Sequence, residues 1–132
     1  KLARDLKLSS RIIFLGYRSD VKEIMAVSDC FAMPSFREGV PRSLLEAMDL
    51  GIPCVGSDTR GIRDLIGKHE EGGILCDPHD PQSFACAFET LIDATPEDLL
   101  KMKKRNQQEA KKYSNEVVRA EIKEIINKEL IH

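Results

Sequence analysis

Short runs of consecutive apolar residues alternate with segments of helical periodicity along the first two thirds of the chain. The apolar runs lie at Ile12–Leu15, Cys30–Met33, Pro53–Val55 and Gly73–Cys76. Strands that are apolar at consecutive positions, rather than at alternate ones, are typical of parallel sheets covered on both faces. The pattern therefore predicts an α/β fold built on a doubly wound parallel sheet.

Helical periodicity fills the intervals between these runs and replaces the strand signals completely after Pro81. The predicted helices are Val21–Val27, Pro41–Leu50, Gln82–Ile92, Pro96–Lys112 and Asn115–Ile131. A chain of this length normally forms one core. We therefore predict a single domain over residues 1–132, in which residues 96–132 form a helical C-terminal extension.

Residues typical of helix ends support several of these boundaries. Asp20 is followed three residues later by Glu23, which predicts a capping box at the start of a helix. Gly16, Gly51 and Gly67 lie where predicted elements should end. The opening residues resemble the end of an amphipathic helix and include no initiating Met, so we expect the chain to begin inside a larger unit.

Composition narrows the class of protein. The 132 residues include 22 acidic and 20 basic side chains, a formal charge of −2, without the basic excess that binding along nucleic acid requires. No apolar run approaches the ~20 residues of a membrane-spanning helix. The histidines lack ligand spacing, which argues against a metal site. Buried, reduced thiols of a cytoplasmic protein are expected at the four separated cysteines, Cys30, Cys54, Cys76 and Cys86.

The segment after the second apolar run carries the clearest chemistry. Pro41 suits the first turn of a helix, where its missing N–H costs nothing. The free backbone amides of Arg42, Ser43 and Leu44 would then form an anion site of the kind that holds phosphates. The Arg42 cation is unfavourable at the positive end of the helix dipole unless an anion binds there. Gly39, which has no Cβ, would let a ligand approach the backbone closely.

The next turn of this helix contributes an acid. A projection at 100° per residue places Pro41, Leu45 and Met48 on one apolar face and predicts that Glu46 points away from the core. The alternative is an ordinary loop and helix with solvated charges, and the residues by themselves favour neither interpretation.

Motifs in a fixed order make the sequence similar to a known family. They are Phe14-Leu15-Gly16-Tyr17, Ser28-Asp29, Pro34-Ser35, the pair Glu38 and Glu46, Glu46-Ala47-Met48, Gly51-Ile52-Pro53-Cys54-Val55, Gly61-Ile62-Arg63-Asp64-Leu65-Ile66 and Glu71-Gly72-Gly73-Ile74-Leu75. Over residues 8–90 the chain resembles the donor-binding C-terminal half of GT-B glycosyltransferases, in particular the large retaining family four. Arg60-Gly61 departs from the Gly-Gly turn often seen in that family, with Asp64 at the position of the acid that follows.

The resemblance implies a Rossmann-like domain that binds a nucleotide sugar. Glu38 would be the catalytic residue and contact the donor sugar near its reacting carbon, while the amides of Gly39 and Val40 hold sugar hydroxyls.

The start of the following helix would bind the rest of the donor. Arg42 and the amides of Ser43 and Leu44 would hold the diphosphate, and Glu46 would accept hydrogen bonds from the two ribose hydroxyls.

The implied reaction transfers a sugar, as in hexosyltransferases, from a nucleotide diphosphate to an acceptor hydroxyl with retention. It needs no metal or other cofactor and would serve surface or capsular polysaccharide synthesis at the cytoplasmic side of the inner membrane. The implied partner is an N-terminal acceptor-binding domain of the same enzyme. That domain, and a basic pair that neutralises the diphosphate, would lie upstream of Lys1, so we expect the chain alone to be inactive and to bind nucleotide weakly.

Other functions compete with this one. The same fold could be a non-catalytic nucleotide-binding or interaction module, and Glu38 with Glu46 could be the paired acids of a glycosidase. The basic residues within 101–112 could give the full-length enzyme a peripheral membrane contact, but the acids between them favour a solvated helix face.

Overall fold

A three-stranded parallel sheet forms the centre of the computed structural model, which describes residues 1–67 and 71–130. Its strands, in the order β1-β2-β3, are β1 (Phe31–Met33), β2 (Cys54–Ser57) and β3 (Gly73–Cys76). Ala32 lies opposite Val55, which in turn lies opposite Ile74. The predicted class, a parallel α/β sheet, is confirmed.

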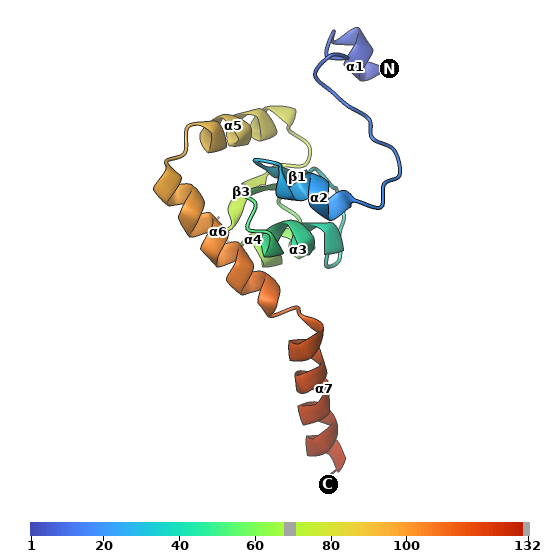
Figure 1. The fold of residues 1–132 in the computed structure, drawn as a ribbon, viewed down its shortest axis with the longest axis vertical. Coiled ribbons are helices and arrows are strands. Elements are labelled where there is room, and N and C mark those ends of the chain that lie inside the picture. Colours follow the sequence, from blue (N-terminus) through green and yellow to red (C-terminus); the bar gives the residue numbers. More distant parts are fainter. Residues whose placement is uncertain (68–70, 131–132) are drawn as a thin grey trace.

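Helices cover both faces of this sheet. They are α1 (Leu2–Asp5), α2 (Val21–Ala26), α3 (Arg42–Asp49), α4 (Arg60–Ile66), α5 (Pro81–Ile92), α6 (Pro96–Lys111) and α7 (Asn115–Leu130). Figure 1 shows α3 and α4 on one side of the strands and α5 on the other. This arrangement explains why the strands are apolar at consecutive positions, since helices pack on both faces and every residue of the central strand β2 is buried.

The apolar core has a part on each side of the sheet. The side of α3 and α4 holds Met25, Leu44, Ala47, Met48, Ile52, Cys54, Ile62, Leu65, Ile66 and Ala110. The side of α5 holds Val55, Cys76, Ala87 and Leu91. Neighbouring residues of β2 therefore enter opposite halves of the core, which holds the central strand in place from both sides.

A buried amide ties α6 to the sheet. Asn106 is fully buried, and its Nδ2 donates to the carbonyl oxygens of Ile52 and Gly72, at 2.9 Å each. These carbonyls lie just before β2 and β3. One side chain thus fixes the starts of two adjacent strands to the same helix.

The predicted strand at residues 12–15 is wrong. The segment has no regular secondary structure and forms no part of a sheet, and its side chains are exposed, with Ile13 at 80% and Phe14 at 83%. A strand needs a neighbour for its backbone hydrogen bonds, and no described segment lies beside this one as a partner. An apolar run alone is therefore not sufficient to form a strand.

The predicted capping box is also wrong, whereas two glycine stops are confirmed. The carboxylate of Asp20 accepts hydrogen bonds from the Arg18 guanidinium, with Nε at 2.7 Å, and α2 begins without a side-chain cap. Because Arg18 binds the charged form, it lowers the pKa of Asp20. Gly51 follows α3 with φ +75°, and Gly67 ends α4 with φ +96°.

The C-terminal helices differ in their surroundings. Helix α6 packs against α3, while α7 extends away from the sheet in Figure 1. The exposed aliphatic side chains of α7 are Val117, Val118, Ile122, Ile125 and Ile126. The predicted last helical residue, Ile131, lies outside the described residues. No helix of the described chain combines the length and apolar character needed to cross a bilayer.

Candidate functional site

The loop between β1 and α3 lies at the carboxyl ends of the strands, where doubly wound sheets bind their ligands. It covers residues 34–41, between the last residue of β1 and the first of α3. A hollow of about 370 Å³ opens between this loop and α4. Its lining includes Glu38, Gly39, Val40, Arg60, Asp64 and Tyr113. Three of the predicted site residues therefore share one hollow.

The Glu38 carboxylate is held by its own loop. Ser35 Oγ donates to Glu38 Oε1 at 2.8 Å, and both residues are half-buried. Among the described residues, no ion pair neutralises Glu38. The acid is thus oriented by a neutral donor and keeps hydrogen-bonding capacity for a ligand.

Helix α3 begins without a cap. Pro41 occupies the N-cap position with φ −72° and ψ +114°, and a proline side chain can accept no hydrogen bond from the first turn. The first backbone bond of the helix runs from the Leu45 amide to the Pro41 carbonyl, at 3.2 Å. In the described chain no acceptor is recorded for the amides of Arg42, Ser43 or Leu44. These donors, at the positive end of the helix dipole, can bind an anion.

The charged side chains of α3 lie on its outer side. Leu44, Ala47 and Met48 are fully buried, whereas Glu46 is half-buried and Arg42 exposed. Within the residues that the structure describes, Arg42 and Glu46 form no ion pair with each other or with another side chain. Glu46 therefore retains its full capacity as an acceptor about one helical turn from the free amides.

Two residues of this region were not among the predicted site residues. Ser35 belongs to the Pro34-Ser35 motif, and its spacing of three residues from Glu38 is the signal that could have identified it. Tyr113 follows α6 and reaches the hollow only through the tertiary fold, so no local pattern could have placed it there.

The crossover from β2 to α4 brings further polar atoms to the same end of the sheet. The hydroxyls of Ser57 and Thr59 are buried and have no hydrogen-bond partner among the described residues. Thr59 occupies the N-cap position of α4, but its side chain does not cap the helix. No group of three or more His, Cys, Asp or Glu side chains in the described part of the chain could hold a metal ion.

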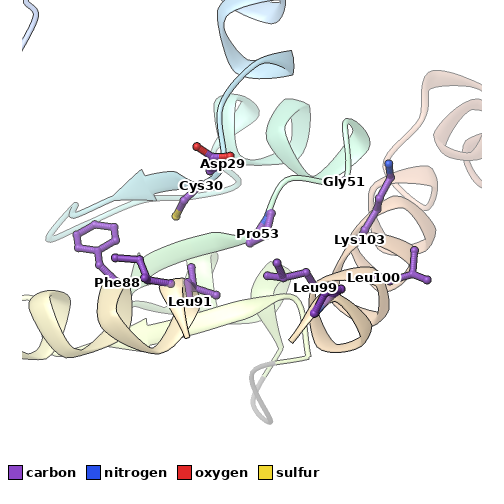
Figure 2. Close-up of a pocket in the computed structure, with 11 residues that line it drawn as sticks. Asp29, Cys30, Gly51, Pro53, Phe88, Leu91, Leu99, Leu100 and Lys103 are labelled. Atoms are coloured by element: carbon purple, nitrogen blue, oxygen red, sulfur yellow. The ribbon is translucent and has the colours of Figure 1, made fainter. Parts of the chain in front are cut away.

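A larger hollow, of about 870 Å³, lies at the opposite end of the sheet (Figure 2). Cys30 and Pro53, which immediately precede β1 and β2, line it together with Leu91 and Leu99 of α5 and α6. Figure 2 shows these side chains between the strand starts and the two helices. Its lining is mainly apolar and includes none of the predicted site residues, so the polar loop at the carboxyl ends is the better candidate.

The cysteines differ from one another in burial. Burial raises the pKa of Cys54 to about 12 and that of Cys30 to about 11, so both thiols stay protonated near neutral pH. Cys76 is also buried, and the described chain contains no disulfide. The expectation of burial is wrong for Cys86, which lies on the outer side of α5 and is exposed.

We therefore expect one rapidly reacting thiol in the folded chain. Near pH 8 the thiolate fraction of Cys30 should be about one in a thousand, and that of Cys54 smaller still. Titration with Ellman's reagent should show one fast equivalent, removed by Cys86→Ser, and the remaining thiols only after unfolding. Two or more fast equivalents would contradict this assignment.

Residues 1–113 match the protein family described as glycosyl transferases group 1. Over 102 residues the chain is 36% identical to the UDP-Gal:alpha-D-GlcNAc-diphosphoundecaprenol alpha-1,3-galactosyltransferase of Escherichia coli, covering 77% of this chain and 25% of that protein. Over 85 residues it is 36% identical to the N-acetyl-alpha-D-glucosaminyl L-malate synthase of Bacillus anthracis, covering 64% of this chain and 22% of that protein.

A solved structure has the same fold. The crystal structure of Anabaena Alr3699/HepE in complex with UDP superimposes with a TM-score of 0.87 at 28% identity, over 96% of this chain and 35% of that one. The chain thus spans about a quarter to a third of the length of these relatives.

Proposed function

This chain belongs to the glycosyl transferases group 1 family, and from that premise we propose that it binds the nucleotide-sugar donor of a retaining, metal-independent glycosyltransferase. The observation that carries this proposal is the uncapped start of α3 beside the loop of Glu38. A solved relative holds UDP on the same fold, which supports a nucleotide as ligand.

The diphosphate is assigned to the first turn of α3. Its first three amides, which have no acceptor within the described chain, point along the helix axis and, with the helix dipole, favour a negative charge. The exposed Arg42 side chain can turn toward the same anion. A bound diphosphate thereby relieves the unfavourable position of this cation.

The ribose is assigned to Glu46. A carboxylate can accept one hydrogen bond at each oxygen, which suits two neighbouring hydroxyls, and such charge-assisted bonds are worth about 1.5–3 kcal/mol. Glu46 is half-buried and forms no ion pair in the described chain, so no protein cation has to be displaced.

The donor sugar is assigned to the hollow lined by Glu38, Gly39 and Val40, with the two amides at the sugar hydroxyls. In the transfer, the bond from the anomeric carbon to the phosphate oxygen breaks and a bond to the acceptor oxygen forms on the same face. The acceptor proton passes to the departing phosphate. Glu38 stabilises the cationic sugar, and the α3 amides stabilise the charge that grows on the leaving group.

The acceptor is assigned to a separate domain of the same enzyme. The relatives are about three to five times as long as the region they share with this chain. We place the basic groups that complete the diphosphate site in the first strand and helix of the complete donor-binding half. The chain alone is therefore expected to bind nucleotide weakly and to transfer no sugar, and the whole enzyme to act in surface polysaccharide synthesis at the cytoplasmic side of the membrane.

Nucleotide binding tests this assignment directly. Titration of the chain with UDP and with GDP, followed by amide chemical shifts, should move the amides of Arg42, Ser43 and Leu44 first. The variant Glu46→Gln should weaken binding of the better nucleotide about 10- to 100-fold, because loss of one charge-assisted contact costs ~1.5–3 kcal/mol.

The matched control is Glu89→Gln, which removes the same charge from the exposed side of α5. It should leave the affinity unchanged. If neither nucleotide shifts the α3 amides at millimolar concentration, or if both variants behave alike, the assignment of α3 is wrong.

A further inference from the structure

A glycine of α4 lies against the loop that carries Glu38. A Cβ atom placed on Gly61 would lie 1.6 Å from the carbonyl oxygen of Gly39 and 2.7 Å from that of Glu38. Both neighbours are main-chain atoms, so no change of rotamer could make room for it. The backbone of α4 and the backbone of the loop are therefore in direct contact through Gly61.

The backbone conformation does not explain this glycine. The glycines with positive φ are Gly16, Gly51 and Gly67, so Gly61 has a conformation that any residue can adopt. It is the second residue of α4, and glycine in a helix is less stable than alanine by about 1 kcal/mol. The close approach of the loop is the remaining reason for a glycine here.

The other side of the loop is open. A Cβ atom on Gly39 would meet no atom within 4 Å. A side chain at position 61 should therefore push the loop outward rather than remove α4 from the sheet. Ordinary contact begins near 3.4 Å, so the Gly39 carbonyl would have to move by about 2 Å.

We infer that Gly61 is a positioning residue for Glu38. Because Gly61 has no side chain, the first turn of α4 contacts the backbone of the loop directly, and this contact fixes the position of the loop and of its Glu38 carboxylate. Ser35 holds the same carboxylate from within the loop, at 2.8 Å, so moving the loop carries both residues with it. This role of Gly61 in the reaction rests on the proposed function. A displacement of the Glu38 carboxylate by about 1 Å affects the rate only if that group must be aligned with the donor sugar.

The contact can be tested on the chain itself without any ligand. In Gly61→Ala, the backbone amide resonances of residues 36–40 should shift in a 1H–15N correlation spectrum, while those of β3 and α5 stay in place. Unchanged loop resonances would overturn the contact. An unfolded variant would also overturn it, because the loop has open space into which it can move.

The matched control is Gly56→Ala, which crowds the other side of α4. A Cβ atom there would lie 2.5 Å from Ile62 Cγ2 and 2.9 Å from Ile66 Cδ1, both in side chains of the core. This variant should lower the melting temperature without shifting the amide resonances of residues 36–40.

Kinetics of the complete enzyme test the positioning role. With UDP-glucose and UDP-galactose as donor probes, Gly61→Ala should lower kcat about 100-fold. The affinity for UDP, which carries no sugar to contact the loop, should change less than threefold, because the α3 contacts do not move. Gly56→Ala, assayed below its melting temperature, should keep the wild-type kcat. A wild-type kcat in Gly61→Ala would overturn the positioning role. A wild-type enzyme that transfers no sugar from any nucleotide would overturn the proposed function and this role with it, and would leave the result on the loop resonances standing.

Discussion

Replacing Asn106 with aspartate should lower the free energy of unfolding by about 4 kcal/mol or more at pH 7, the largest loss of stability that we expect from one substitution. Asn106 Nδ2 donates to two carbonyl oxygens, and aspartate would place a carboxylate oxygen against both of them. Asn106 Oδ1 is buried and accepts no hydrogen bond from the described residues, so a carboxyl at this position should have a raised pKa.

The pH dependence of this variant follows from the direction of that shift. An acid whose pKa is higher in the folded than in the unfolded state destabilises the fold as pH rises above the unfolded value. The defect of Asn106→Asp should therefore be smallest near pH 4, where the protonated acid can donate to one carbonyl. It should grow by about 1.4 kcal/mol per pH unit until the folded acid ionises. Urea unfolding at several pH values measures this slope.

Two further variants distinguish the effect of the lost hydrogen bonds from the effect of the buried charge. Asn106→Leu keeps the volume but leaves both carbonyls without this donor, and should cost about 2–4 kcal/mol at every pH. Lys104→Ala changes an exposed residue of the same helix and should stay within about 0.5 kcal/mol of the parent. Equal stability of Asn106→Leu and the parent would show that the bridge between α6 and the strand starts contributes nothing.

Replacing Glu38 with glutamine should reduce sugar transfer by the complete enzyme about 100- to 1,000-fold, the size of effect seen when one charge-stabilising group is removed from a transition state. Glutamine retains an oxygen that can accept from Ser35 Oγ, so the loop should keep its conformation. The loss should therefore appear in kcat, with the melting temperature and the affinity for UDP unchanged.

Removal of the Ser35 hydroxyl should have a smaller effect than the change at Glu38. Ser35→Ala removes one neutral hydrogen bond to Glu38 and should reduce kcat only about 3- to 10-fold, equivalent to ~0.5–1.5 kcal/mol. If Glu38→Gln transfers sugar at the wild-type rate, the catalytic assignment fails, and a non-catalytic nucleotide-binding module becomes the better interpretation of the same fold.

The elements that could be predicted from the sequence are those whose signals are local. Consecutive apolar residues gave the three strands of the sheet, because burial on both faces leaves no polar alternation. Gly51 and Gly67 marked helix ends because both adopt positive φ there. Pro41 marked the start of α3, so the position of the unpaired amides followed from the sequence as well.

The features that were not predicted depend on partners far away in the chain or on competition between partners. The run at residues 12–15 has the composition of a strand but no neighbouring strand in the described fold. Asp20 has the spacing of a cap, yet the Arg18 guanidinium binds its carboxylate instead. Asn106 and Tyr113 act on segments that lie tens of residues away, and Gly61 is explained only by the loop it meets in space.

The isolation of α7 affects how unfolding of this chain should be measured. A solitary helix of 16 residues is only marginally stable in water, so α7 should lose and regain its turns gradually over a wide temperature range. Ellipticity at 222 nm adds this gradual signal to the cooperative melting of the sheet and its covering helices. A two-state fit to that signal would yield an enthalpy that is too small, whereas a probe confined to the core would report the sheet alone.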